Sequence, residues 1–263
     1  MNYLIHLICK SICNIIYYKK KSLYFRLIKF LSLNNFCYSY DGFKIYGDNL
    51  ADITFKYTVG GFYMSKFQKT ISLINKPFYF LDIGSNIGYF SLVVGKNHNC
   101  KKIFTFEPNP KIFKSLKKNL IYNLSSVKFK AYKAAISKNY RKLKFYIDLE
   151  DSGSSSLIKK KNDKVIYVNS YNYRIFNQIY NKLKDIDIIT KIDVEGKDLE
   201  VLKELKKSKL FKNIRLIYIE TKNNDQEIKN IKKNLRDFAL EGKYPIIDSS
   251  KSYKQVDLQF SRL

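Results

Sequence analysis

The sequence is poor in the residues that usually bind zinc or form disulfides. Its 263 residues include four cysteines and two histidines. The cysteines form no Cys-x-x-Cys pair, so the spacing typical of a zinc site is absent. We therefore expect reduced thiols, as in a cytosolic protein, and no metal held by these residues.

Acidic residues are also few. There are 23 Asp+Glu against 49 Lys+Arg, which gives a formal net charge of +26. Such an excess is typical of proteins that bind nucleic acid, anionic lipid or phosphorylated substrates. Tryptophan is absent and proline is scarce, whereas Lys, Asn, Ile, Tyr and Phe are abundant, a bias that an A/T-rich genome would produce. The charge is therefore weak support for a nucleic-acid partner, while phosphate-bearing small substrates remain compatible with it.

No long apolar run is present. Residues 3–18 are rich in Leu and Ile, but polar side chains interrupt them and the lysines at 19–21 follow rather than precede them. This pattern is neither a secretory signal nor a secure membrane span. The apolar residues recur at helical spacing, which predicts an amphipathic helix that either covers the core or brings residues 1–30 to an anionic membrane. We expect a cytoplasmic protein, in the second case at the inner membrane face.

The most informative segment runs from residue 80 to residue 90. An apolar stretch contains Asp82 near its end, and Gly84 and Gly88 follow before a helical pattern begins. Glycines let the backbone turn sharply and approach a ligand, which the amides opening the next helix would face. The spacing is Gly-x-x-x-Gly, not the Gly-x-Gly-x-x-Gly of dinucleotide enzymes. It favours S-adenosylmethionine over NAD, although a plain strand-to-helix turn also uses glycines.

Apolar strands alternate with amphipathic helices after about residue 76. This alternation predicts an α/β fold with a parallel sheet. Asn109 and Pro110 suit the N-cap and first turn of one helix. We expect a variable N-terminal segment over 1–76 and one domain over 77–263. The predicted strands lie at 79–84, 103–107, 127–136, 187–193, 214–220, 244–247 and 255–260. Helices are predicted from 88, over 110–122 and over 225–240, and another carries Leu199, Leu202 and Leu205. Short β-like runs at 143–147 and 165–168 flank a serine-rich loop and predict a hairpin near the cleft.

Glu107 ends the strand that follows the glycine turn, 19 residues beyond Gly88 (107 − 88). Nucleotide-binding folds place a ribose-binding acid about 20 residues beyond their glycines. We therefore predict that Glu107 accepts both ribose hydroxyls and that Asp82 lies near the cationic amino group of the cofactor. Ala134 and Ala135, after the third strand, would give adenine a flat apolar wall or pack the sheet.

Lys191, Asp193 and Glu195 alternate with apolar residues at the end of a predicted strand. On an extended chain these three side chains project to one side. Burying charged side chains costs free energy unless they form ion pairs or take part in binding or catalysis. Ligands bind at this edge of open α/β sheets. We predict that they are catalytic and that Glu220, ending the next strand, completes an acidic pocket. In the structural alternative, Glu195 and Asp198 stabilise the next helix and Lys191 neutralises Asp193.

Taken in order, these motifs resemble the FkbM family of S-adenosylmethionine-dependent methyltransferases over residues 80–221. The resemblance rests on DIGSNIGYF from Asp82, FEPNP from Phe106, SGSSS from Ser152, and KIDVEG from Lys191 with LEVL after it. It implies the class I methyltransferase fold, a Rossmann-like doubly wound sheet that is mostly parallel with a C-terminal antiparallel strand. The family commonly methylates oxygen on sugars or on secondary metabolites.

The resemblance also implies a set of site residues, with S-adenosyl-L-methionine as the cofactor. The expected cofactor-binding residues are Asp82, Gly84, Asn86, Gly88, Tyr89, Glu107, Pro108, Asn109, Ala134 and Ala135. The expected substrate-binding residues are Ser154, Ser155 and Glu220, and the expected catalytic residues are Asp193, Glu195 and Lys191.

Methyl transfer to a hydroxyl requires a group that removes the proton. Of the two histidines only His98 would be a candidate, and a histidine in a loop after the first cofactor helix is more often a surface residue than a base. We therefore predict Asp193 or Glu195 as the base or as a carboxylate that positions the acceptor, tuned by Lys191. A divalent metal held by Asp193, Glu195 and Glu220 would do similar work by lowering the hydroxyl's pKa, and the sequence leaves this open.

The expected activity is O-methylation of a sugar, either nucleotide-linked or part of a surface-polysaccharide or capsule precursor. The alternatives are a nucleic-acid methyltransferase and a methyltransferase of a non-sugar secondary metabolite. The chain has no Asn/Asp-Pro-Pro-Tyr/Phe segment for amino-group methylation and no Pro-Cys nucleophile for cytosine, so no nucleic-acid partner is expected. A non-catalytic protein that kept the fold is disfavoured by the retained motifs.

Overall fold

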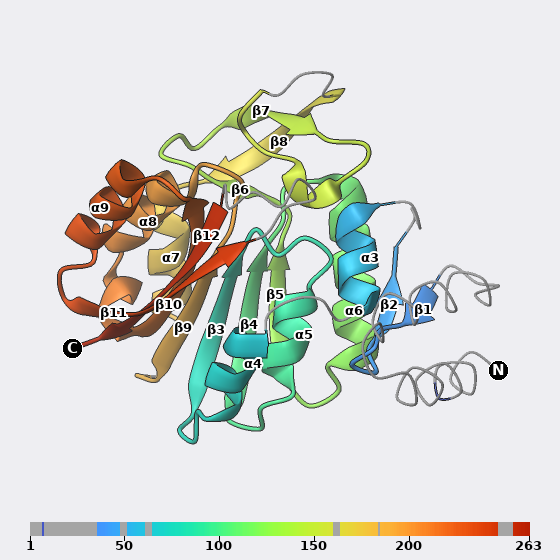
Figure 1. The fold of residues 1–263 in the computed structure, drawn as a ribbon, viewed down its shortest axis with the longest axis horizontal. Coiled ribbons are helices and arrows are strands. Elements are labelled where there is room, and N and C mark those ends of the chain that lie inside the picture. Colours follow the sequence, from blue (N-terminus) through green and yellow to red (C-terminus); the bar gives the residue numbers. More distant parts are fainter. Residues whose placement is uncertain are drawn as a thin grey trace.

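A mostly parallel sheet forms the centre of the structure (Figure 1). The structure is a computed structural model, and it describes residues 36–47, 52–60, 65–159, 164–183, 185–246 and 255–263, together with Leu7. The sheet has seven strands in the order β11-β12-β10-β9-β3-β4-β5. The strands are β3 (Phe78–Ile83), β4 (Cys100–Phe106), β5 (Lys128–Tyr132), β9 (Asp187–Ile192), β10 (Ile214–Lys222), β11 (Phe238–Ile246) and β12 (Gln255–Arg262).

The direction of the strands confirms the predicted topology. Neighbours from β5 to β10 pair in parallel, whereas β12 is antiparallel to both β10 and β11. The strand order reverses its direction of growth between β3 and β9, which is the place where open α/β sheets bind ligands beyond the carboxyl ends of their strands.

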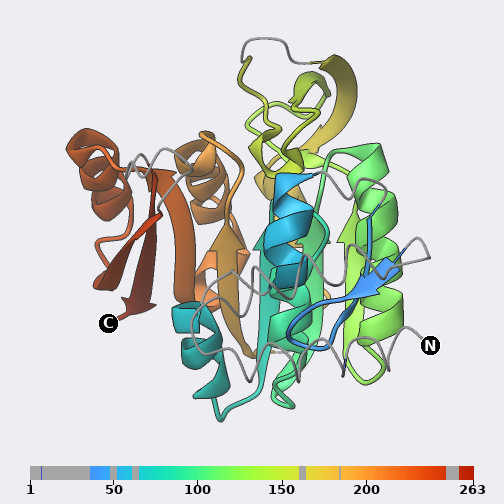
Figure 2. The ribbon, with the colours of Figure 1, turned by 45° about the vertical axis from the view of Figure 1, so that its right-hand side comes forward.

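Helices cover both faces of this sheet, as Figures 1 and 2 show. One face carries α4 (Ser65–Ser72), α5 (Tyr89–Gly95) and α6 (Pro110–Asn123), and the other carries α7 (Tyr173–Tyr180), α8 (Asp198–Lys206) and α9 (Asp225–Asn234). Strand β3 is buried along its whole length and serves both layers, because Phe80 packs toward the first face and Leu81 toward the second. The connection from α8 to β10 includes the short helix η2 (Lys209–Asn213).

The predicted hairpin forms a second, three-stranded sheet with the order β6-β8-β7. Its strands are β6 (Ala135–Ile136), β7 (Lys142–Ile147) and β8 (Lys164–Tyr171), and it lies above the carboxyl edge of the main sheet in Figure 1. The short helix η1 (Ser152–Ser154) belongs to the serine-rich loop that follows β7.

The N-terminal residues that the structure describes pack onto the first helical layer. Strands β1 (Phe36–Tyr38) and β2 (Lys44–Tyr46) form a hairpin, and helix α3 (Ile53–Gly60) follows it. The side-chain oxygens of Asn119 and Asn123, both on α6, accept hydrogen bonds from the backbone of β2. These elements share a core with α5 and α6. The division of the chain at residue 76 stays a prediction.

The predicted amphipathic helix at the N-terminus lies outside the described residues. Among the helices that the structure does describe, no helix is long and apolar enough to cross the bilayer.

Three predicted elements were clearly wrong in their bounds, one of them the strand expected over 244–247, which is β11 and begins at Phe238. The strand expected over 127–136 is divided, because β5 ends at Tyr132 and Ala135–Ile136 pairs with β8 in the smaller sheet. The helix expected over 225–240 ends at Asn234, and β11 begins at Phe238. Phe238 and Leu240 resemble helical positions in the sequence, but their pairing with β12 is a tertiary contact that overrides the local pattern.

Gly84 marks the closest approach between the ends of β3 and β9. Its φ is +78°, and a Cβ atom there would lie 1.7 Å from the carbonyl oxygen of Asp193. Gly42 provides a matched control, since its φ is +86° but nothing lies within 4 Å of such a Cβ.

We expect Gly42→Ala to destabilise the protein by about 1–2 kcal/mol, the cost of a left-handed backbone for a residue with a Cβ atom. Gly84→Ala adds a backbone clash to that cost and should destabilise it by roughly 4 kcal/mol or more. Urea unfolding of both variants measures the difference, and equal losses would contradict the close packing of the two strand ends.

Candidate active site at the carboxyl edge of the sheet

The turn after β3 is anchored to the end of β4. The amide groups of Gly84 and Ser85 both donate to the carbonyl oxygen of Phe106 at 3.0 Å, and Gly88 donates to the carbonyl of Ser85 at 2.8 Å. Asn86 takes a left-handed backbone with φ 46°, which is uncommon for a residue other than glycine. The shape of the turn is therefore fixed by its hydrogen bonds to Phe106 as well as by its glycines.

All five amide groups from residue 84 to residue 88 have a partner inside the chain. Asn86 donates to Glu107 Oε2 at 3.0 Å, and Ile87 donates to the side-chain oxygen of Asn86 at 2.7 Å. A pyrophosphate needs free amides in its glycine turn, so this turn is unsuited to a dinucleotide. A cofactor without phosphate does not need them, which agrees with the preference for S-adenosylmethionine over NAD.

Glu107 lies directly beyond β4 with 6% of its surface exposed. Its Oε1 accepts a hydrogen bond from the amide of Asn109 at 2.7 Å, and burial raises the pKa of its carboxyl group to about 7. Each oxygen of a carboxylate can accept two hydrogen bonds, so each keeps one position for a ribose hydroxyl. The carboxylate beside the turn thus fits the ribose of the expected cofactor.

The other predicted cofactor residues lie in three different places. Asn109 is the N-cap of α6, as predicted, with its side chain accepting from Lys111, and Pro108 is half-buried beside it. Tyr89 is buried, and its hydroxyl donates to Asp41 Oδ2 at 2.5 Å, so it faces the N-terminal hairpin. Ala134 and Ala135 are buried, and Ala135 packs in the core of the smaller sheet.

Lys191 is the cation at the centre of the site. Only 2% of its side chain is exposed, and its Nζ donates to the carbonyl of Gly84 at 2.8 Å and pairs with Asp193 Oδ2 at 3.0 Å. A second carboxylate, Asp82 Oδ1, lies 3.9 Å away and is fully buried. Burial lowers the pKa of Lys191, but Asp193 and Asp82 more than offset this, so its pKa is raised and it keeps its charge.

Asp82 has a different environment from that predicted. Its Oδ2 accepts from the hydroxyl of Ser91 on α5 at 2.6 Å, and Oδ1 is buried without a hydrogen bond. Burial raises the pKa of Asp82, and Lys191 partly offsets the shift. Because the carboxylate has 0% exposure, it acts on the cofactor turn through Lys191 and not through an open surface.

A tight turn places Glu195 over the end of the sheet. Glu195 has φ 57° and Gly196 has φ 97°. The buried carboxylate of Asp198 holds this turn, because its two oxygens accept from the amides of Val194 at 2.8 Å and Gly196 at 2.9 Å. A glutamate in the left-handed region is strained, and strain of this kind gathers at functional sites. Asp198 therefore has a structural role, but it holds the turn before α8 and not the N-terminus of the helix that the structural alternative named. The other part of that alternative, the pairing of Lys191 with Asp193, is present.

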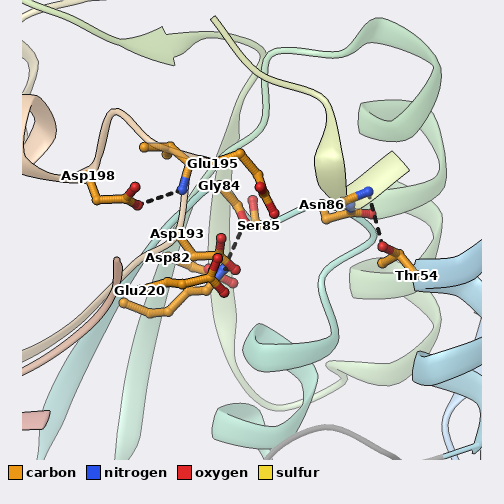
Figure 3. A network of polar contacts seen from close by, with 12 residues as sticks. Thr54, Asp82, Gly84, Ser85, Asn86, Asp193, Glu195, Asp198 and Glu220 are labelled. Atoms are coloured by element: carbon orange, nitrogen blue, oxygen red, sulfur yellow. Dashed lines mark hydrogen bonds and ion pairs between the residues drawn. The ribbon is translucent and has the colours of Figure 1, made fainter. Parts of the chain in front are cut away.

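Asp193, Glu195 and Glu220 come together as predicted (Figure 3). Each has one carboxylate oxygen within 4.8 Å of the others, and all three side chains are partly buried. Burial, followed by the charges of Asp193 and Glu195, raises the pKa of Glu220 well above its usual value. Three acids this close can share a proton or hold a divalent cation, the two chemistries that the sequence left open.

Two residues of the last strand, which were not predicted from the sequence, join the acidic group. Gln255 Nε2 donates to Glu220 Oε1 at 2.5 Å, and Asp257 pairs in register with Glu220. Burial raises the pKa of Asp257 to about 7. The sequence carries no local signal for them, because antiparallel pairing brings β12 to β10 across 35 residues.

The serine loop meets the cofactor turn through Ser152. The side-chain amide of Asn86 donates to the Ser152 hydroxyl at 3.4 Å. The predicted substrate residues have partners within the loop itself, since the hydroxyl of Ser154 donates to Asp151 and that of Ser155 accepts from the amide of Asp148.

Comparison with known proteins agrees with this geometry. The sequence model of the Methyltransferase FkbM domain matches residues 82–246. The methyltransferase sdnD of Sordaria araneosa is 28% identical over a stretch that covers 50% of this chain and 61% of that protein. The chain thus spans less than two thirds of this relative's length.

Solved structures share the fold. Trm5 of Methanocaldococcus jannaschii in complex with adenosine has a TM-score of 0.50 at 16% identity, with 88% of this chain and 57% of that chain covered. The complex of aTrm5 with tRNALeu has the same TM-score at 15% identity, covering 88% of this chain and 54% of that chain. At such identities the likeness shows the class I methyltransferase fold alone.

The buried carboxyl group of Glu107 should make stability depend on pH. Its pKa rises from 4.5 to about 7 in the folded chain, so the folded chain holds a proton that the unfolded chain releases in this interval. We expect the free energy of unfolding of the cofactor-free protein to fall as pH rises through this window, by roughly 3 kcal/mol for this group.

Urea unfolding at several pH values measures this slope. Glu107→Gln should flatten it, whereas Asp225→Asn, at an exposed position on α9, should leave it unchanged. A slope in Glu107→Gln equal to that of the natural protein would contradict the assignment.

Proposed function

The chain belongs to the FkbM family of S-adenosylmethionine-dependent methyltransferases, and from this premise we propose that it methylates a hydroxyl group of a sugar. The proposed acceptor is a nucleotide-linked sugar or a precursor of a surface polysaccharide. The observation that carries the proposal is the group Asp193, Glu195 and Glu220, whose carboxylate oxygens lie within 4.8 Å beside the cofactor turn. A sugar hydroxyl needs such a base, because its own proton is held tightly.

The chain's contribution begins with binding. S-adenosylmethionine supplies a methyl group already activated by its sulfonium. Glu107 accepts the ribose hydroxyls, and the 84–88 turn sets the position of the cofactor next to the end of β9. Holding two reactants in line is worth on the order of 7–11 kcal/mol, so this positioning is the larger part of the expected catalysis.

The carboxylates then accept the proton and hold the acceptor. Lys191 pairs with Asp193 at 3.0 Å and holds that carboxylate at the end of β9. Asp193 or Glu195 takes the hydroxyl proton, and Glu220 holds the acceptor by a hydrogen bond. The raised pKa of Glu220 supports this division, since a carboxyl that keeps its proton near neutral pH can donate to an acceptor oxygen.

A wholly different acceptor would be an RNA. The net charge of +26 and a cavity of about 350 Å³ at the opposite end of the sheet, with Lys206, Lys209, Lys212 and Arg262 in its wall, favour a phosphate-bearing partner. The net charge also suits a nucleotide-linked sugar, whereas the cavity lies at the end of the sheet away from the proposed site. Transfer of labelled methyl groups to tRNA at a rate that matches the best sugar would therefore replace the sugar proposal.

We also propose the cytoplasm as the location, as the sequence led us to expect. The described cysteines Cys37 and Cys100 are both free and buried, which suits a reducing compartment. Membrane contact through residues 1–30 stays a prediction, because these residues, apart from Leu7, lie outside the described structure.

The cofactor assignment predicts selective binding. Calorimetric titration should give micromolar affinity for S-adenosylhomocysteine and no binding of NAD. Glu107→Ala should weaken the affinity about 10- to 100-fold, the value of hydrogen bonds to a charged group. Unchanged affinity in Glu107→Ala would overturn the ribose assignment.

The base assignment predicts that Asp193→Asn and Glu195→Gln are slow enzymes that still bind cofactor. We expect kcat for the best sugar to fall about 10²–10⁴-fold in at least one of them. Glu195→Gln should change S-adenosylhomocysteine affinity less than about threefold, whereas Asp193→Asn also weakens the ion pair with Lys191 and is compared by kcat at saturating cofactor. Asp225→Asn is the control for a carboxylate on the surface. Near-normal turnover in both variants would remove the carboxylate base.

A further inference from the structure

The start of α3 is joined to the serine loop by the carboxylate of Asp52. Its Oδ1 accepts from the amide of Phe55 at 2.8 Å, which caps the helix, and its Oδ2 accepts from the amide of Ser152 at 2.8 Å. The hydroxyl of Ser152 also donates to Oδ1 at 3.1 Å. One buried side chain, with 7% exposure, thus holds two segments that are 100 residues apart.

Neighbouring residues strengthen this junction. The hydroxyl of Thr54 donates to Asp151 Oδ1 at 2.7 Å and accepts from the amide of Gly153 at 3.0 Å. The amide of Ile53 donates to the carbonyl of Glu150 at 3.1 Å. A Cβ atom on Gly153 would lie 2.3 Å from the Thr54 hydroxyl oxygen, so the two segments are in close contact.

The junction continues into the cofactor turn. Ser152 accepts from the side-chain amide of Asn86 at 3.4 Å and donates to Asp52, which gives a chain of hydrogen bonds from amide to hydroxyl to carboxylate. Figure 3 shows Thr54, at the start of α3, facing Asn86 across this junction. The charged end of such a chain polarises the bonds before it and strengthens them.

We propose that Asp52 is a positioning residue of the methyl-transfer site, which acts through Ser152 to hold Asn86 and the cofactor turn in their binding shape. The inference rests on the proposed cofactor site. Asp52 lies outside the residues 82–246 that match the family, so the N-terminal segment supplies a part of the site that the family motifs do not contain.

Asn86 is the place where such support matters. Its backbone is left-handed, and its own amide donates to Glu107, the predicted ribose ligand. Without Ser152 as a partner for its side-chain amide nitrogen, Asn86 would lose one of the contacts that select this backbone conformation. A change at Asp52 therefore reaches the ribose carboxylate of Glu107 through Ser152 and Asn86, although Asp52 itself bonds only to Ser152 of these residues.

The test is a double-mutant cycle on S-adenosylhomocysteine affinity, measured by calorimetry on the full chain. We expect Asp52→Ala and Asn86→Ala each to weaken binding about 5- to 10-fold. The double variant should be weaker than Asn86→Ala by less than about twofold, because the Asp52 effect passes through Asn86. If the loss of affinity in the double variant equals the product of the two single losses, the proposal is overturned, because Asp52 then acts independently of Asn86 and supports only α3.

Ser152→Ala keeps the proposal testable if Asp52→Ala does not fold, because it leaves Asp52 free to cap α3. It should reproduce the loss of affinity, and its cycle with Asn86→Ala should be equally non-multiplicative. Ser72→Ala, which removes an exposed hydroxyl bonded only within α4, is the matched control and should bind as the natural protein does. Natural affinity in Ser152→Ala would overturn the proposal.

A cofactor-free measurement separates this proposal from the proposed function. Hydrogen exchange of the Asn86 amide should become about tenfold faster in Ser152→Ala, whereas amides of α4 should not change. If the natural protein does not bind S-adenosylhomocysteine, the proposed function fails, while this exchange still reports on the junction. Unchanged exchange at Asn86 would show that the serine loop does not hold the turn and would overturn the inference.

Discussion

The buried charge of Lys191 is the constraint on which the rest of the site depends. An ammonium group with 2% exposure is tolerated only where partners replace its lost water, and its partners are the carbonyl of Gly84 and the carboxylates of Asp193 and Asp82. These partners belong to the ends of β3 and β9. The ion pairs therefore fix the two strand ends together, and with them the cofactor turn on one side and the acidic group on the other.

The acidic group gains its character from this arrangement. Asp193, Glu195, Glu220 and Asp257 crowd the carboxyl edge, and Lys191 is the single buried cation among the described residues near them. Burial, reinforced by the charges of the neighbouring acids, raises the pKa of Glu220 and of Asp257, so the group holds protons near neutral pH. A cationic cofactor or a bound cation would find compensating negative charge at this edge.

The glycine turn differs from the phosphate-binding turn of dinucleotide enzymes in how its amide groups are used. Its amides are satisfied by Phe106, Ser85, Glu107 and Asn86, so the turn recognises its ligand through side chains and shape instead of through amide donors. The serine loop and α3 then meet the turn from outside the main sheet. The cofactor end of the site is thus assembled from three segments, one of which precedes the family motifs.

The sequence by itself determined the sheet, the cofactor turn and most of the acidic group. Asp82, Gly84, Glu107, Asp193 and Glu220 all stand at strand ends, and parallel strands bring those ends to one edge. Only the tertiary structure decided the split of the strand at 127–136, the role of Gln255 and Asp257, and the contact of Asp52 with Ser152. Local patterns report which face a side chain takes, whereas pairing across 35 or 100 residues depends on how separate elements pack, which no local pattern encodes.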